Sequence, residues 1–143
     1  MTIAAWESFI ESAIFYRAME CAAKYNVPKE VVMELIEGPL NEELKKSNTP
    51  DSGNLRRLSK RYIGVDVAAC WKWSGINSKT ATERLDKLIK TRGKLAHNAR
   101  GLRWTSGRGK TEILRKTVVD GIELIERLYR CTQKAFEMMP REL

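Results

Sequence analysis

Apolar side chains recur every three or four positions along most of this chain, which is the period of an amphipathic α-helix. In the first segment the pattern starts after Thr2, a residue suited to capping a helix, and lasts to about Asn26. Its apolar positions are Ile3, Trp6, Ile10, Ala13 and Ile14. We therefore predict a long first helix.

A second helix is predicted from Pro28, because proline suits the first turn of a helix. We expect Gly38 and Pro39 to break it, with a short helical piece continuing to Lys46. The apolar face of this helix would consist of Val31, Val32, Leu35 and Ile36. Residues 47–54, SNTPDSGN, are typical of a polar loop.

Two short segments follow, and they differ in polarity. In NLRRLSKRYIG, residues 54–64, the apolar side chains would face inward while the cations stay in water. The inward positions are Leu55, Leu58 and Tyr62, and the cations are Arg56, Arg57, Lys60 and Arg61. VDVAACWKW, residues 65–73, has the composition of a strand, but no partner strand is evident in the sequence. We predict a buried helix there, ended by Ser74 and Gly75.

The second half of the chain contains two longer helical patterns. One runs from Lys79 to His97, with Thr80 and Glu83 as a capping box. Its buried positions would be Leu85, Leu88, Ile89 and, more loosely, Leu95 and Ala96. The other starts near Thr111, after a basic loop rich in glycine, with apolar positions Leu114, Val118, Ile122, Ile125, Leu128, Phe136 and Met139. We predict an all-α fold, an up-and-down bundle of four to five helices forming a single domain over residues 1–143.

The formal charge of +8 at neutral pH is unevenly distributed. Residues 1–53 contain five basic and nine acidic side chains, a net −4, whereas residues 54–143 contain 21 basic and nine acidic side chains, a net +12. A basic surface attracts polyanions, so the second half modestly favours a nucleic-acid partner over a purely solubilising role.

The sequence favours an intracellular setting without a membrane or a cofactor. No apolar run is long enough to span a membrane, and the opening MTIAAWESFIE lacks the basic region of a signal peptide. The cysteines, Cys21, Cys70 and Cys131, are far apart and odd in number, which argues against a disulfide framework or a zinc site. No glycine-rich nucleotide-binding motif occurs. We expect a cytoplasmic protein with reduced thiols, no metal and no cofactor.

The stretch TRGKLAHNAR, residues 91–100, contains the only histidine of the chain, His97, five positions after Arg92. Histidine is a natural general base near neutral pH, and RNA carries its own nucleophile, the 2′-hydroxyl. A base that removes this proton, with a guanidinium on the phosphate, allows in-line attack that leaves a cyclic phosphate and needs no metal. Positions five apart on a helix lie about 140° from each other. The pair therefore cooperates best if the helix ends or bends between its members, for which Gly93 offers a place, or if two chains pool their residues.

The longer stretch LDKLIKTRGKLAHNARG resembles the signature of the HEPN superfamily, in which a helix ends in Arg, four to six residues and then His. Leu85, Leu88 and Ile89 match the lead-in, and Arg92, Ala96 and His97 match the motif. The upstream CWKWSGI resembles the RiboL-PSP-like branch, and the opening WESFIE and the long closing helix fit the same bundle.

The resemblance implies a helical bundle that forms a homodimer, with two Arg–His motifs facing each other in one cleft. It also implies metal-independent endoribonuclease activity, often in toxin–antitoxin, antiviral or RNA-processing systems. Arg92 and His97 would be the catalytic residues, RNA the substrate, and an antitoxin protein a possible partner.

Two positions depart from the family pattern. The residue after the arginine is usually polar, often Asn, and helps to organise the site, but here it is Gly93. Where some branches carry a tyrosine that is modified by a nucleotidyltransferase antitoxin, this chain has Ala99, so that control is unsupported. Two alternatives stay open: a non-catalytic HEPN-type module that binds RNA or protein, and a structural dimerisation domain whose charge is incidental.

Several residues near the motif have two interpretations each. Lys94, Arg100 and Arg103 could guide the RNA backbone or form an ordinary solvated face, and Asn98 could contact the site or end the helix. Trp104 could stack a base, although packing is favoured, and Trp6, Trp71 and Trp73 are expected in the core or an interface. Residues 107–110 could hold a phosphate or form a flexible loop, and Asp66 or Glu83 could pair with Arg92 or His97.

Overall fold

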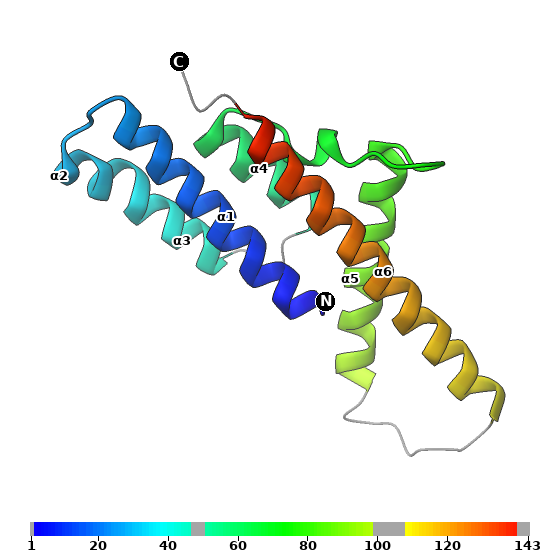
Figure 1. Ribbon diagram of the computed structural model, residues 1–143. Helices are drawn as coiled ribbons and strands as arrows, with labels where there is room; N and C mark the ends of the chain where they lie inside the picture. Colours follow the sequence, from blue (N-terminus) through cyan, green and yellow to red (C-terminus); the bar gives the residue numbers. More distant parts are fainter. Residues whose placement is uncertain (1, 47–50, 99–107, 140–143) are drawn as a thin grey trace.

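The computed structural model describes residues 2–46, 51–98 and 108–139, and for 95–98 and 108–114 it describes the helical backbone only (Figure 1). Within these residues the fold is all-α, with six α-helices, a π-helical turn, a 3₁₀ turn and no strand, which confirms the predicted class. No described helix has the length and the apolar character needed to cross a membrane.

Helix α1, Ile3–Lys24, forms as the apolar rhythm predicted. The Thr2 side chain accepts a hydrogen bond from the backbone N–H of Ala5 at 3.2 Å, which confirms Thr2 as the N-cap. One residue in every four is buried, and these residues are Trp6, Ile10, Ile14, Ala18 and Ala22. This stripe faces the other helices and forms one wall of the core.

The predicted break at Gly38 and Pro39 is wrong, because the chain stays helical there. Helix α2, Lys29–Val32, passes into a π-helical turn, Met33–Glu37, and then directly into α3, Gly38–Lys46. In a regular α-helix the Pro39 ring would collide with the carbonyl of Leu35. The π turn, in which the Gly38 N–H donates to the Met33 carbonyl five residues back, widens the helix and accommodates proline.

Helix α4, Ser52–Ile63, begins at an Asp51 cap and ends at Gly64, whose φ of +77° is the left-handed conformation that favours glycine. Leu55 and Leu58 are buried, as predicted. Asp86 accepts hydrogen bonds from both the backbone N–H and the hydroxyl of Ser52, at 2.9 and 2.7 Å. This carboxylate at a helix N-terminus attaches α4 to α5.

The predicted buried helix over 65–73 is reduced to a four-residue 3₁₀ turn, Val67–Cys70. The Ala68 carbonyl accepts a hydrogen bond from the Trp71 N–H within this turn, at 3.2 Å, and a second one from the Ser78 hydroxyl at 2.9 Å. The Trp71 ring enters the core, where its Nε1–H donates to the Thr132 hydroxyl at 2.9 Å. Side-chain anchoring thus overrides the helical preference of this apolar segment.

Helices α5, Ser78–Asn98, and α6, Arg108–Met138, cross each other, and the N-terminal end of α6 extends away from α1–α4 (Figure 1). The N-cap of α5 is Asn77, whose side chain accepts from the Thr80 N–H, so the predicted capping box at Thr80 is wrong. Gly121 lies at the crossing. A Cβ there would approach the Leu88 side chain to 3.0 Å, so glycine allows the two helices to pack closely.

The core lies where α1, α4, the 3₁₀ turn, α5 and the C-terminal half of α6 meet. Trp6 and Trp71 are fully buried, with ring centroids 5.9 Å apart, and Leu55, Leu85 and Leu128 surround them. Trp73 is half-buried at its edge. The predictions that Trp6 and Trp71 belong to the core are confirmed.

Candidate functional site

Positions 92 and 97 lie in the last two turns of α5, which is one α-helix from Ser78 to Asn98. The possibility that the helix ends between them is thereby excluded. A Cβ built on Gly93 would meet nothing within 4 Å, so no described neighbour requires glycine there. On a continuous helix the two positions stay about 140° apart, so one chain does not bring Arg92 and His97 to the same side of α5.

The Arg92 guanidinium is held by Glu7 of α1, with 2.5 Å between Nη1 and Oε1. Glu7 is 17% exposed and Arg92 is 47% exposed, so the carboxylate is largely shielded while the guanidinium keeps part of its donor edge in water. Asp66 and Glu83, which could have paired with Arg92, form no ion pair with it among the described residues. Glu7 takes this place instead.

Sequence reasoning missed Glu7 because it lies 85 positions from its partner. The available signal was the acidic residue within WESFIE, the opening that matches the family's first helix. The charge of Glu7, after burial, is the second cause that raises the pKa of Glu11 one turn further along α1. The N-terminal half of α1 thus places two carboxylates near one another, and one of them holds the arginine.

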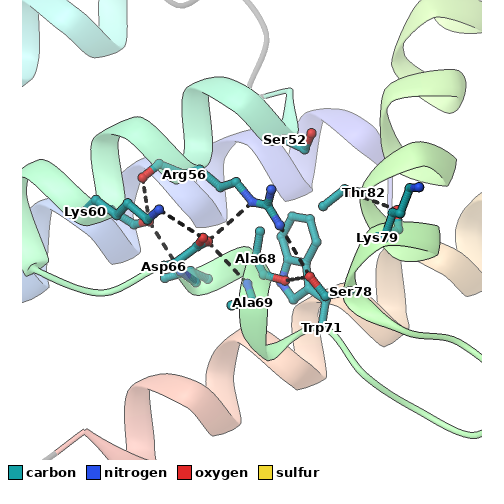
Figure 2. A network of polar contacts seen from close by, with 12 residues as sticks. Ser52, Arg56, Lys60, Asp66, Ala68, Ala69, Trp71, Ser78, Lys79 and Thr82 are labelled. Atoms are coloured by element: carbon teal, nitrogen blue, oxygen red, sulfur yellow. Dashed lines mark hydrogen bonds and ion pairs between the residues drawn. The ribbon is translucent and has the colours of Figure 1, made fainter.

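Asp66 is occupied elsewhere, as Figure 2 shows. Its carboxylate lies 3.5 Å from Arg56 Nε and 3.4 Å from Lys60 Nζ, both on α4. The same carboxylate accepts from the Ala69 N–H, which caps the 3₁₀ turn. The role of Asp66 is therefore to join α4 to the following segment.

The basic segment on α4 is also neutralised by Glu43 of α3. Glu43 accepts from Arg57, from Arg61 at 2.6 Å and from the Tyr62 hydroxyl at 3.0 Å. Burial raises the pKa of Glu43, but these hydrogen bonds and the two arginine charges outweigh it and lower that pKa. The pKa of Tyr62 is raised, first by burial and then by its bond to Glu43. The four cations keep 41–62% of their side chains exposed, as predicted, and also bind carboxylates of α3 and of the segment that follows α4.

The remaining predicted residues lie at or beyond the end of α5. Lys94 is exposed on the helix, and the backbones of His97 and Asn98 form its last turn. Arg100, Arg103 and Trp104 lie outside the described residues. Of residues 107–110, which could hold a phosphate or form a flexible loop, 108–110 belong to the first turn of α6, and Gly107 lies outside the described part.

A groove of about 600 Å³ runs between α5 and α6 beside their crossing. Arg84, Lys87 and Thr91 line it from α5, and Trp73 and Arg127 contribute from the preceding turn and from α6. On α6, Val118, Val119 and Ile122 are 58%, 55% and 39% exposed. The sequence pattern placed two of these, Val118 and Ile122, among the apolar positions of this helix, and in the single chain both side chains are exposed.

Metal ligands and disulfides do not define this site. Among the described residues, no group of three or more His, Cys, Asp or Glu side chains is placed to hold a metal ion. Cys21, Cys70 and Cys131 are free cysteines. Cys70 is exposed on the 3₁₀ turn, while Cys21 and Cys131 are half-buried within α1 and α6.

Comparison with known proteins identifies a family. A model of the RiboL-PSP-HEPN family matches residues 1–138, almost the whole chain, including α5 with Arg92 and His97. No curated protein and no solved structure matches significantly.

Proposed function

The chain belongs to the RiboL-PSP-HEPN family, whose members have RNA-related and often nuclease roles, and we propose that it is a metal-independent endoribonuclease. Arg92 and His97 are the catalytic residues of this proposal. The observation that carries it is the setting of Arg92: this residue lies on the family-matched helix α5, and its half-exposed guanidinium is oriented by the shielded carboxylate of Glu7 on α1. Such a guanidinium is suited to bind a phosphate by its remaining donors.

The proposed reaction uses the substrate's own 2′-hydroxyl. His97 takes the 2′-hydroxyl proton, and the oxygen forms a bond to the adjacent phosphorus while the bond to the 5′-oxygen breaks. The leaving oxygen takes up a proton, which gives a 2′,3′-cyclic phosphate and a 5′-hydroxyl end. Arg92 stabilises the negative charge that builds up on the phosphate oxygens in the transition state.

We propose that the active form is a homodimer. The 140° separation of positions 92 and 97 on a continuous helix favours a site in which two chains each supply a residue. Val118, Val119 and Ile122 form an exposed apolar stretch of α6 at the level of the second half of α5, and burying it against a second copy would remove this surface from water.

Val118→Glu places a charge in this apolar stretch and should therefore weaken the dimer. Analytical ultracentrifugation should show a shift toward monomer, and the cleavage rate should fall.

The decisive test is cleavage of RNA by purified protein in the presence of EDTA. Wild type should produce 2′,3′-cyclic phosphate ends, and Arg92→Ala and His97→Ala should each lower the rate by at least about a hundredfold while circular dichroism shows an unchanged fold. Intact RNA with wild type, or unimpaired cleavage by His97→Ala, would refute the proposal.

One observation favours a second candidate, a non-catalytic HEPN-type module that binds RNA or protein. Gly93 stands where the family usually has a polar residue that helps to organise the site. RNA binding that weakens steeply with salt and persists in both alanine variants, without cleavage by wild type, would support this candidate.

If the ribonuclease acts as a toxin or in antiviral defence, it should also affect living cells. Overexpression of wild type should arrest growth unless an antitoxin is present, and overexpression of His97→Ala should not.

A further inference from the structure

The exposed cations of this protein are not equally available to a ligand. The densest basic segment of the sequence, on α4, is engaged by Glu43 and Asp66. A phosphate would have to compete with these partners for the α4 cations. A surface for polyanions is therefore better sought where exposed cations have no carboxylate partner among the described residues.

Helix α5 offers such a surface. Lys87, Lys90 and Lys94 are exposed, and none of them forms an ion pair with another described residue. At 100° per residue, positions 87, 90, 94 and 97 fall within an arc of about 80°. We call the three lysines the lysine stripe. It extends along α5 for about 10 Å and leads to the turn that contains His97.

The groove between α5 and α6 adjoins this stripe and shares Lys87 with it. Arg84 and Arg127 add two cations to its lining, and Trp73 adds a half-buried aromatic ring. Asp120 and Glu123 also line it, so the groove combines cations with hydrogen-bond acceptors and an aromatic surface. Cations along a helix beside an aromatic groove suit a strand whose bases are unpaired and free to turn out.

We infer that single-stranded RNA lies along the lysine stripe, with its backbone phosphates on Lys87, Lys90 and Lys94 and a base turned toward the α5–α6 groove. The strand reaches the cleavage point at the His97 end of α5. This inference rests on the proposed ribonuclease function and adds the path of the substrate. The rate of cleavage and the affinity for uncleaved RNA can be measured separately, so the two proposals can fail separately.

The test measures binding of a fluorescent single-stranded RNA whose 2′-hydroxyls are methylated, so that it binds without being cut. In the triple variant K87E/K90E/K94E the Kd should rise at least tenfold by fluorescence anisotropy. The slope of log Kd against log salt concentration should fall by about 2, because three phosphate contacts on a single strand are lost. The neutral variant K87Q/K90Q/K94Q should show a smaller change in the same direction.

The matched control is K29E/K45E/K134E, which changes the net charge equally at exposed lysines on α2, α3 and α6. Its Kd should change by less than about threefold. If control and stripe variants weaken binding equally, net charge accounts for binding and the inference is overturned. If wild type binds by the stripe but cuts no RNA, the ribonuclease proposal fails and the binding surface remains. If wild type cuts RNA and the stripe variants bind and cut normally, only the path along α5 fails.

Discussion

At the scale of single residues, the main finding is that the motif arginine is held by a carboxylate from the first helix. The 2.5 Å contact with Glu7 uses Nη1, so with respect to the described residues Nη2 and Nε of the guanidinium are left for a phosphate. The sequence identified Arg92 from its motif, but a partner 85 positions away depends on how α1 packs against α5. Such a contact has no local sequence pattern, so it required the structure.

Glu7→Gln should lower the cleavage rate, because the neutral amide holds the guanidinium less firmly and less of the Arg92 population is correctly oriented. We expect kcat to fall by about ten- to a hundredfold with little change in KM. A loss of this size is typical when a catalytic group, here the Arg92 guanidinium, is displaced by about 1 Å or less from its reactive position. Steady-state kinetics on a fluorescent RNA substrate measures both constants.

Glu11→Gln is the matched control, since Glu11 lies one turn further along the same helix and has no ion pair with Arg92 among the described residues. Its kcat should stay within about twofold of wild type. A Glu7→Gln enzyme that is faster than wild type would show the opposite role, in which Glu7 competes with RNA for Arg92.

Substitutions at position 93 can test the stability of α5 and the organisation of the site separately. A side chain fits there without a clash, because a Cβ meets no atom within 4 Å. Gly93→Ala should raise the unfolding free energy by up to about 1 kcal/mol through helix propensity and leave cleavage unchanged. Gly93→Asn, which restores the polar residue usual in the family, should raise kcat. Equal kcat values for the two variants would show that a polar group at this position does not serve the reaction.

At the scale of elements, the periodicity of apolar residues was sufficient to predict a helix wherever the local sequence pattern and the packing in the fold agree. It predicted α1, α4 and α5 within a few residues and the all-α class. It failed at two places for different reasons. Residues 67–71 are held in a short turn by hydrogen bonds to Ser78 and Thr132, which lie 10 and 61 positions from their partners, so periodicity alone did not predict this turn. The π turn before Pro39 is a local change of helix type that keeps α2 and α3 continuous, and the pattern of apolar positions does not distinguish it from a break.

The Glu43 contact between α3 and α4 predicts a pH dependence of stability. Because folding lowers the pKa of Glu43 below its ordinary value of 4.5, its ionised form stabilises the folded state. This contribution is fully present above about pH 5 and is lost as the pH falls through the lowered pKa. Glu43→Gln should therefore reduce the unfolding free energy at pH 7 by about 1–2 kcal/mol, and the difference from wild type should shrink below pH 4.5.

Urea denaturation of both proteins across this pH range measures the difference directly. The raised pKa of Glu11 has the opposite sign, but it is present in both proteins and cancels. Glu42→Gln is the control: Glu42 is adjacent but exposed, and its contact with Lys46 is 3.8 Å, so we expect a change below about 0.5 kcal/mol. A Glu43→Gln deficit that stays constant down to the acid limit would contradict the ionic origin of the contact.

At the scale of the whole molecule, α5 and α6 carry most of the features that the proposals use. The lysine stripe, Arg92 and the exposed valines lie on these two helices, and the groove runs between them with Trp73 of the preceding turn in its lining. The sequence pattern placed Val118 and Ile122 on the apolar face of the last helix, but periodicity shows only that a face is apolar and does not identify what covers it. If a second copy of the chain covers this face, Val118 and Ile122 are buried in the dimer, which explains why apolar residues occupy positions that are exposed in the single chain.

The proposed dimer makes a prediction about mixtures of inactive chains. If each site takes Arg92 from one chain and His97 from the other, a dimer of one Arg92→Ala chain and one His97→Ala chain contains one intact site and one site without either residue. Equal amounts of the two variants, unfolded together and refolded, form mixed dimers as half of the population. The mixture should therefore regain about a quarter of wild-type cleavage, although each variant refolded alone stays inactive.

The control for this mixture is the double variant Arg92→Ala, His97→Ala refolded with wild type. Its mixed dimers contain no intact two-chain site, because each site lacks one residue, so cleavage should come only from the wild-type dimers that remain, about a quarter of the population. If each chain instead used its own Arg92 and His97, the mixed dimer would keep one intact site, and the total would rise to about half. In that case the mixture of the two single variants would also stay inactive, so the two experiments together identify which chain supplies each residue.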